Sequence, residues 1–413
     1  MFLYGFLSTI IFIIGMPFVF AARKIIGKPN AGLKAKFGFV ETPDFGEEDV
    51  IMLHGVSVGE IIALENLAKK IKAVFPHKKL VVTTGTKTGQ EIAQKKYAET
   101  ADFITYFPFD IPFCVNKFLD RVKPSMVFIA ETEIWPYFAY SCNKRSIPVS
   151  IINGRISDST FKSYEKVKFF FKEVFKNFTA VYTQSEDDKR KYIAIGAAPE
   201  KVEVMGNLKF DVKRQDVPID IGQEGFRVVI AGSTHSGEDE IVLNTFKELK
   251  QKYPDIKLLL APRHPKRVPD IENLIKNLKL DYGLRSKDDK FTQYDIIVLD
   301  TLGELGKMYS ICHFAFIGGS FNKTGGHNPL EAAVYDKPTI TGPSIHNFKD
   351  IYWTLDKTDA GKIVNTPEEL KNYMDKLLSD KEFYTKACED CKNVFEAQKG
   401  ALDFVIDKIS KLS

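Results

Sequence analysis

The sequence has 413 residues, which is enough for two domains of ordinary size, each with its own hydrophobic core. Its hydrophobic content of 44% and charged content of 27% are typical of a globular protein and exclude a disordered chain. The net charge of +4 is too small to indicate a nucleic-acid partner, and we expect none.

The N-terminal residues Met1–Ala22 carry no charged side chain, and a helix of this length rises about 33 Å, enough to cross a bilayer core. Basic residues follow, with no acidic residue before Glu41. This pattern predicts a membrane helix with the body of the protein in the cytoplasm. A cleaved signal peptide is disfavoured because no basic segment precedes the apolar run. A helix lying in one leaflet is a further alternative, which Gly15 and Pro17 would permit.

Short apolar runs then alternate with amphipathic helical stretches, which predicts parallel sheets covered by helices on both faces. Strands are expected in the first half at 50–53, 80–84, 103–107, 126–130, 149–152 and 180–183, and the clearest helices at 61–74, 88–97 and 164–178. In the second half, strands are expected at 228–231, 258–261, 296–299, 314–317 and 339–341.

The resulting organisation is α/β, with two Rossmann-like doubly wound domains. We expect a membrane helix at 1–22, an acceptor-binding domain at 23–207, a polar linker at 208–226 and a nucleotide-binding domain at 227–380. Helices at 381–413 could pack back on the first domain. Because ligands of such sheets bind beyond the carboxyl ends of the strands, the loops that follow the strands are the candidate sites.

Glu60 is the candidate general base. It stands near the start of the helix that follows the first strand, in the motif His54–Glu60. A carboxylate over an open cleft could take a proton from an attacking hydroxyl. Helix capping is the alternative role for this acid, because a helix N-terminus stabilises an anion.

Further polar residues of the first half follow other strands. Glu131 and Glu133 stand beside Trp135 and Pro136, where they could bind acceptor hydroxyls, or they could simply be solvated acids. Arg155 and the small-residue loop around Thr84 suit anionic groups of an acceptor.

The most informative motif of the second half is Gly318–Glu331. It is an apolar strand, a glycine-rich loop and a helix start, with Asn328 as the N-cap. Backbone N–H groups there could hold a phosphate while Glu331 binds a ribose. An ordinary close-packed corner is the alternative. Other residues expected around the same nucleotide are Ser233, Thr234, His235, Pro262, Arg263, His264, Gly303, Glu304, Gly319 and Gly326.

The four histidines of these loops lie far apart in the sequence, so we expect no metal site and no other cofactor. The five cysteines are few and mostly within apolar stretches, as in proteins of a reducing compartment. The sequence also lacks the P-loop lysine motif, the Gly-x-Gly-x-x-Gly dinucleotide motif after its first strand, and the Gly-x-Ser-x-Gly elbow of hydrolases.

Taken in order, these motifs resemble the 3-deoxy-D-manno-octulosonic acid (Kdo) transferase family of lipopolysaccharide assembly. The resemblance rests on the segments 54–60, 131–136, 153–157, 206–211, 231–238, 261–264 and 318–331. One small departure is Lys36 before Phe37-Gly38, where relatives more often carry an arginine.

The resemblance implies a GT-B glycosyltransferase that moves Kdo from CMP-Kdo to the lipid A precursor lipid IVA with inversion. It implies Glu60 as the general base, with acceptor contacts at Ser57, Gly59, Thr84, Glu131, Glu133 and Arg155. It also implies the inner membrane of a Gram-negative bacterium, with the catalytic domains on the cytoplasmic face. A GT-B enzyme that uses a UDP-sugar on another membrane lipid is the nearest alternative, and a catalytically inactive nucleotide-binding protein is a second.

Overall fold

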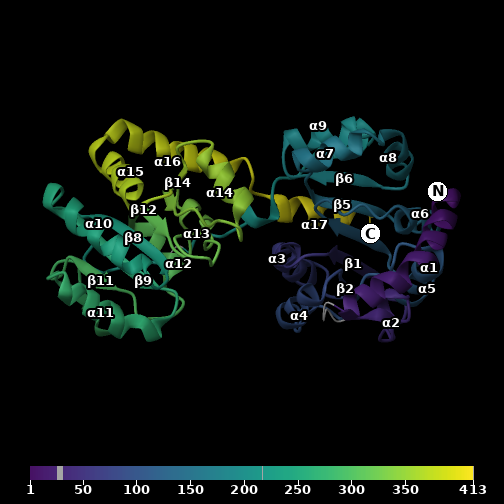
Figure 1. Ribbon diagram of the computed structural model, residues 1–413, viewed down its shortest axis with the longest axis horizontal. Coiled ribbons are helices and arrows are strands. Elements are labelled where there is room, and N and C mark those ends of the chain that lie inside the picture. The colour runs from purple at the N-terminus through teal and green to yellow at the C-terminus, as the bar shows by residue number, and fades with distance from the viewer. Residues whose placement is uncertain (26–30, 216, 413) are drawn as a thin grey trace. The chain divides into compact units, whose positions relative to one another are not determined.

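The computed structural model describes residues 1–25, 31–215 and 217–412, and the chain divides into two compact units. Unit 1 comprises Met1–Asp211 and Gln398–Ser413, and unit 2 comprises Val212–Ala397. Among the described residues, each unit contains one seven-stranded parallel sheet with helices on both faces (Figure 1). The α/β class with two doubly wound parallel sheets is therefore confirmed.

The sheet of unit 1 has the strand order β3-β2-β1-β4-β5-β6-β7. Its strands are β1 (Val50–Gly55), β2 (Lys79–Thr84), β3 (Phe103–Tyr106), β4 (Met126–Ala130), β5 (Val149–Gly154), β6 (Ala180–Thr183) and β7 (Val202–Val204). The helices of this unit are α1 (Phe2–Ile25), α2 (Leu33–Lys36), α3 (Val58–Val74), α4 (Lys87–Lys96), α5 (Pro112–Val122), α6 (Pro136–Lys144), α7 (Asp158–Glu165), α8 (Lys168–Phe175), α9 (Glu186–Ala194) and α17 (Ala401–Leu412).

The sheet of unit 2 has the order β10-β11-β9-β8-β12-β13-β14. Its strands are β8 (Arg227–Thr234), β9 (Ile256–Pro262), β10 (Tyr282–Leu284), β11 (Ile296–Val298), β12 (Cys312–Ile317), β13 (Thr339–Thr341) and β14 (Gly361–Ile363). The helices are α10 (Glu238–Lys252), α11 (Val268–Asn277), α12 (Leu305–Met308), α13 (Leu330–Ala333), α14 (Lys349–Asp356), α15 (Pro367–Ser379) and α16 (Lys381–Glu396).

Alternate residues of the central strands supply two core layers, one on each face of a sheet. In unit 1, Met52 and Ile129 belong to one apolar cluster, whereas Leu53 and Phe128 belong to the other. The six residues of β1 are all buried, which explains why its sequence reads as a continuous apolar run rather than an alternating one. The strand order reverses between β1 and β4 in unit 1, and between β8 and β12 in unit 2. Loops at such switch points are where ligands of doubly wound sheets bind.

Every strand expected from the sequence forms, but three further strands were not predicted. These are β7, β10 and β14, each of three residues and each at an edge of its sheet. The helix expected at 164–178 is two helices, α7 and α8, which are separated at Lys166 and Val167.

The stretch expected as a linker contributes to both cores: Leu208 and Phe210 are buried in unit 1 and Ile221 in unit 2. Of the last 33 residues, α16 belongs to unit 2, whereas α17 packs on α3 of unit 1 (Figure 1).

The N-terminal stretch folds as the helix α1, which packs on unit 1. The Tyr4 hydroxyl donates a hydrogen bond to Asp110 at 3.1 Å, and the Phe12 ring contacts Phe37 and Phe109. Within residues 1–25, 31–215 and 217–412, no helix has the length and apolar character needed to cross a membrane. The prediction of a membrane-spanning helix at 1–22 is therefore not supported.

Candidate active site

Glu60 lies at the carboxyl end of β1, in the first turn of α3. Ser57 is the N-cap of this helix, and its hydroxyl oxygen accepts the Glu60 N–H at 3.3 Å. The Glu60 carboxylate in turn accepts the Ser57 hydroxyl at 2.8 Å on Oε1 and the Val56 N–H at 2.6 Å on Oε2. The arrangement resembles a capping box, except that the carboxylate reaches the N–H of Val56, one residue before the N-cap, so Glu60 has the capping role considered from the sequence. Each carboxylate oxygen still has a second lone pair, so the same contacts orient Glu60 without preventing it from accepting a proton.

Glu133 is close enough to Glu60 and Glu131 for the three carboxyl groups to influence one another. Burial raises the pKa of Glu133 to about 7, and the negative charges of Glu60 and Glu131 add to this effect. Glu131 itself has a positive φ of 58°, in the turn that ends β4. The Lys209 ammonium lies 3.9 Å from the Glu131 carboxylate, so this cation offsets part of the local negative charge. The acids that follow β1 and β4 thus meet at the switch point of the sheet.

Other residues singled out in unit 1 make contacts within the protein. His54 is fully buried, its ring stacks on Phe107, and burial lowers the pKa of its imidazole to about 3. The Thr84 hydroxyl is also buried and donates to Gln90 at 2.5 Å. Gly59 lies in the first turn of α3. The Arg155 carbonyl accepts a hydrogen bond from Thr132, which ties the loop after β5 to the loop after β4.

In unit 2, several backbone N–H groups of the glycine-rich loop after β12 already have hydrogen-bond partners within the protein. The N–H groups of Gly319, Ser320 and Phe321 all donate to the Glu238 carboxylate, at 2.7, 2.7 and 2.8 Å. The N–H groups of Gly318 and Gly326 donate to the carbonyls of Gly232 and Gly319. The helix that follows, α13, has only four residues. The buried side chain of Glu238 therefore occupies the N–H groups of Gly319, Ser320 and Phe321, whereas phosphate binding at the first turn of α13 stays a prediction.

Gly318 and Gly319 are required by close packing. A Cβ atom on Gly318 would lie 2.6 Å from the Ser233 carbonyl oxygen, and Gly319 has a φ of +71° beneath the His327 ring. Close packing, the alternative considered from the sequence, therefore accounts for these two glycines.

Side chains from three loops of unit 2 meet around His235. Its Nε2 lies 2.9 Å from Nε2 of His327, with the two rings stacked, and the His264 ring centre is 5.9 Å away. Arg263 follows β9, and its N–H donates to the Thr234 carbonyl at 2.9 Å.

Of the other residues predicted to bind the donor nucleotide, some are buried or paired within the protein and others are partly exposed. The Thr234 hydroxyl is buried and donates to Asp239 at 2.6 Å, and Pro262 ends the buried strand β9. Glu304, which follows Gly303, is paired with Lys307 at 2.8 Å. By contrast, Asn328 and Glu331 are only partly buried; burial raises the pKa of Glu331, and the charge of Arg263 opposes that shift.

Sequence reasoning missed two residues that organise this part of the chain, Glu238 and His327. Both lie inside motifs that were recognised, but nothing local shows that Glu238 bonds to a loop more than 80 residues away. In the part of the chain that the structure describes, no group of three His, Cys, Asp or Glu side chains is placed to hold a metal ion.

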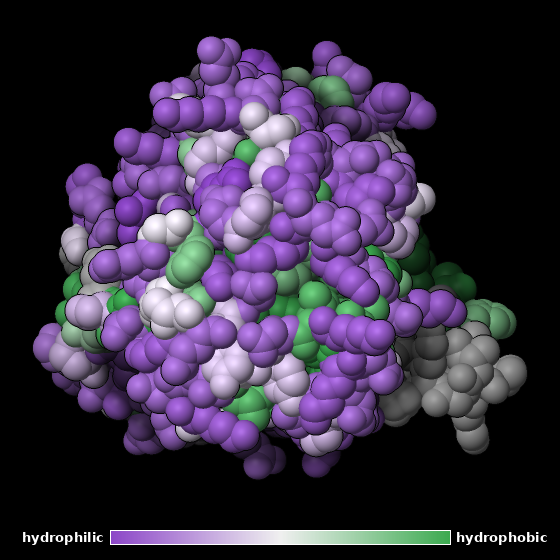
Figure 2. Space-filling view, turned by 90° about the vertical axis from the view of Figure 1, so that its left-hand side faces the viewer, coloured by the Kyte–Doolittle hydropathy of each residue, from purple (hydrophilic) through white to green (hydrophobic). Residues whose placement is uncertain are grey.

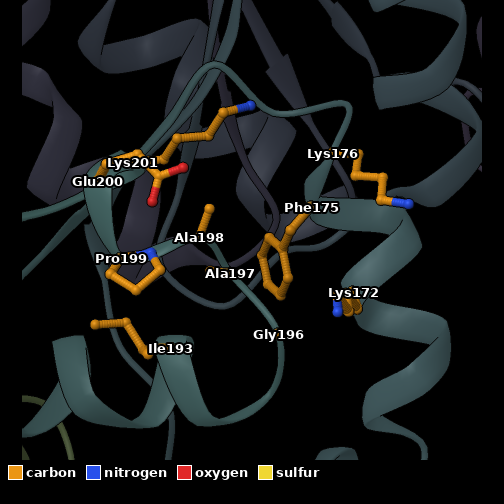
Figure 3. Close-up of a pocket in the computed structure, with 10 residues that line it drawn as sticks. All are labelled: Lys172, Phe175, Lys176, Ile193, Gly196, Ala197, Ala198, Pro199, Glu200 and Lys201. Carbon is orange, nitrogen blue, oxygen red and sulfur yellow. The ribbon is translucent and has the colours of Figure 1, made fainter.

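A cavity of about 640 Å³ lies elsewhere on unit 1, lined by Lys172, Phe175, Lys176 and the segment 196–201 (Figure 3). Its lining residues precede β6 and β7, so the cavity lies at the amino ends of these strands. None of the predicted site residues lines it.

Solved structures with the same fold bind or act on nucleotide sugars. The UDP-GlcNAc 2-epimerase from Neisseria meningitidis bound to UDP-GlcNAc is 14% identical, with 88% of this chain and all of that chain covered and a TM-score of 0.53. At this identity the likeness concerns the fold alone. A second solved structure, the C-terminal CMP-Kdo binding domain of WaaA from Acinetobacter baumannii, is 27% identical over 42% of this chain and 91% of that chain, with a TM-score of 0.40. The class of protein that the structure establishes is therefore α/β, with two doubly wound parallel sheets.

Sequence relatives identify the family within this class. A family model described as 3-deoxy-D-manno-octulosonic-acid transferase (kdotransferase) matches residues 31–212. The 3-deoxy-D-manno-octulosonic acid transferase of Haemophilus influenzae is 33% identical, with 91% of this chain and 90% of the relative covered. That of Rickettsia bellii is 32% identical over 91% and 90% of the two chains. The chain therefore belongs to the Kdo transferase family and is a glycosyltransferase.

Proposed function

We propose that this enzyme transfers Kdo from CMP-Kdo to a hydroxyl group of the lipid A precursor lipid IVA, with inversion, at the cytoplasmic face of the inner membrane of a Gram-negative bacterium. The observation that carries the proposal is the oriented Glu60 carboxylate near Glu133, whose pKa burial raises to about 7, at the switch point of unit 1, in a chain of this family.

Glu60 acts as the general base in this mechanism. It takes the proton of the acceptor hydroxyl as the oxygen attacks the anomeric carbon of Kdo. The bond from that carbon to the phosphate oxygen breaks, and its electron pair leaves with CMP. The Val56 N–H and the Ser57 hydroxyl hold the carboxylate in one orientation, which keeps the accepting lone pair in place during the transfer.

Unit 2 supplies the groups for the donor nucleotide. Arg263, His235 and His264 offer cationic or hydrogen-bonding groups near one another, which suit the phosphate as it gains charge on departure. Glu331 and Asn328 suit the ribose hydroxyls. Because Glu238 occupies the glycine-loop amides, we assign the phosphate to these side chains rather than to the loop backbone.

The surface of α1 supports a location at the membrane. Many of its side chains are large, apolar and exposed: Leu3, Phe6, Leu7, Ile10, Ile11, Ile13, Ile14, Phe18 and Val19. The face of unit 2 seen in Figure 2 is instead mostly hydrophilic, with small apolar areas between polar side chains. Exposed apolar side chains along one helix fit a helix that lies in one leaflet, beside a lipid substrate.

The proposal is tested by transfer from freshly generated CMP-Kdo to lipid IVA in detergent, with EDTA present. We expect Kdo-bearing product from the wild type, because the assigned mechanism uses only side chains and substrate. Glu60→Gln should lower the rate about 10³-fold, in the range of general-base contributions. Glu91→Gln, on the exposed face of α4, is the matched control and should retain full activity.

Competition separates the proposed donor from a UDP-sugar, because CMP should inhibit transfer more strongly than UDP. The proposal fails if the wild type produces no Kdo-bearing lipid, or if Glu60→Gln is as active as Glu91→Gln.

A further inference from the structure

The loops after β8 and β12 are held together by one buried carboxylate. Oε2 of Glu238 accepts both the His235 N–H at 2.9 Å and the Gly319 N–H at 2.7 Å. Oε1 accepts the N–H groups of Ser320 and Phe321. Glu238 is 1% exposed, so solvent does not compete for these bonds. The carboxylate therefore fixes the position of His235 relative to the loop that carries His327.

His327 is fixed from the other side of its loop. Its N–H donates to the Gly318 carbonyl at 3.1 Å, and its carbonyl accepts the Tyr352 hydroxyl at 2.6 Å. The ring lies over Gly319, where any larger residue would displace it, because a Cβ would come within 2.9 Å of the ring. Both imidazole rings are thus placed by contacts that do not involve a ligand.

The contact between the two rings limits how many protons they carry. Their Nε2 atoms are 2.9 Å apart, so one nitrogen must donate a proton and the other must accept it. Two protons cannot occupy this gap. The ring that donates through Nε2 keeps an unprotonated Nδ1, which is where a further proton would be added. The added charge would then be shared through the N–H···N bond.

Charged groups from every neighbouring element act on the pair. The carboxylate of Glu238 from α10 favours protonation, whereas Arg263, His264 and Arg267 from the segment after β9 oppose it. Arg267 is itself paired with Asp239, and Tyr352 contributes a neutral hydroxyl from α14. Burial lowers the pKa of His327 to about 4 and also lowers that of His235, and both shifts favour the uncharged form of the free pair.

We propose that His235 and His327 act as one proton-accepting unit that takes up a single proton when the anionic phosphate of a nucleoside monophosphate binds to unit 2. The proposal rests on the proposed function for the identity of the nucleotide. A phosphate anion beside the pair opposes the effect of Arg263, His264 and Arg267, and so favours the charged form. The pair therefore becomes an imidazolium only when the ligand is bound, because the neighbouring cations disfavour the charged form in the free protein.

The test measures proton uptake when CMP binds to the full-length enzyme. Titration calorimetry at pH 7.0 in two buffers of different ionisation enthalpy gives the number of protons taken up. CMP itself titrates near pH 6, so the relevant quantity is the difference from a variant that lacks the pair, His235→Asn/His327→Asn. His77→Asn is the control, because this histidine is exposed on unit 1.

We expect the wild type and His77→Asn to take up at least about half a proton more than the double variant. By linkage, their Kd for CMP should weaken about threefold more per pH unit between pH 6.5 and 7.5. Equal uptake in all three proteins overturns the proposal, as does an absence of CMP binding to the wild type.

A second measurement needs no variant and so does not depend on how the double variant folds. In wild-type protein labelled at histidine with ¹⁵N, saturation with CMP should convert one pair of imidazole signals to the imidazolium pattern. No such change would overturn the proposal. CMP-linked protonation without Kdo transfer would instead reject the proposed donor and acceptor and leave the histidine pair standing. Kdo transfer without CMP-linked protonation would reject the histidine-pair proposal and leave the proposed function standing.

Discussion

At the scale of single residues, Glu133 is an acid whose pKa the fold raises into the neutral range. Its pKa of about 7 lies well above the ordinary value of a glutamate, so its titration falls near neutral pH. Burial is the main cause, and the charges of Glu60 and Glu131 are the next. Because these carboxyls interact, their protons belong to the cluster rather than to one residue. Loss of the Glu133 proton adds a negative charge near the proposed base.

The rate of Kdo transfer should therefore fall as the pH drops through about 7. Glu133→Gln keeps the size of the side chain but removes its charge, so we expect about a tenfold lower rate and an acidic limb displaced to lower pH. Glu133→Asp should keep the acidic limb of the pH–rate profile, because aspartate also carries a titratable carboxyl. The measurement is the rate from pH 5.5 to 8.5 at saturating substrates. If the acidic limb is unchanged in Glu133→Gln, the limb comes from the titration of another group.

The same shift has a consequence for stability. The folded state binds the Glu133 proton more tightly than the unfolded state, whose carboxyl titrates near 4.5. The contribution of this group to the free energy of unfolding is therefore largest below pH 4.5, and it is lost as the pH rises towards 7. Burial of Glu133 thus lowers the free energy of unfolding at neutral pH, and it also gives the site a carboxyl that titrates near pH 7.

At the scale of elements, α1 is divided into two faces. Tyr4 and Phe12 face unit 1, and the Asp110 carboxylate that holds Tyr4 also accepts the N–H groups of Tyr137 and Phe138 at the start of α6. The opposite face is apolar and exposed. Docking by one face therefore leaves the other available for lipid.

Substitution of the exposed face should weaken membrane binding without unfolding unit 1. Ile11, Ile14 and Phe18 are 70%, 63% and 73% exposed, so replacing all three by glutamine removes few contacts within the protein. Each side chain is worth roughly 1.5–3 kcal/mol when fully buried in an apolar phase, so binding should weaken at least about tenfold even if burial is partial.

Cosedimentation with phosphatidylglycerol vesicles measures this effect. Ile62→Gln, which changes an exposed isoleucine on α3, is the matched control. If the triple variant sediments as the wild type does, α1 is not the membrane contact.

The same scale shows why some elements were harder to predict than others. The central strands are buried on both faces, so their apolar runs are long and visible. The missed strands β7, β10 and β14 have three residues each and lie at sheet edges, where partner strands supply the pairing that the local sequence does not show.

At the scale of the whole molecule, the end of the chain completes a unit formed by its beginning. Asp211 accepts the N–H groups of Gly400 and Leu402, which fixes the start of α17. Val405 and Ile409 of this helix are fully buried in the core of unit 1. Unit 1 is therefore discontinuous in sequence, and residues 398–413 are part of its folding unit.

Truncation after Lys399 should destabilise unit 1 by roughly 5 kcal/mol, because burial of several apolar side chains is lost. The two tryptophans permit separate measurements, since Trp135 belongs to unit 1 and Trp353 to unit 2. In a Trp353→Phe background, urea unfolding followed by Trp135 fluorescence should shift to lower urea. Unit 2, followed by Trp353 in a Trp135→Phe background, should not shift.

Ile409→Ala is a milder form of this test, with an expected loss of about 2–5 kcal/mol, and the exposed Ser410→Ala is its control. Equal urea midpoints for Ile409→Ala and Ser410→Ala would contradict the assigned role of α17.

Glu60 and Glu238 show where sequence information ends. Each stands near the start of the helix that follows the first strand of its unit, after a similar run of small residues. The sequence by itself determined the buried strands, the α/β class and the family, because apolar runs and ordered motifs are local properties. Among the described residues, the Glu60 carboxylate bonds within its own turn, whereas Glu238 binds three N–H groups from a distant loop. Only the tertiary structure decided that difference, and with it the pairing of His235 with His327, because both depend on which loops the strand order places side by side.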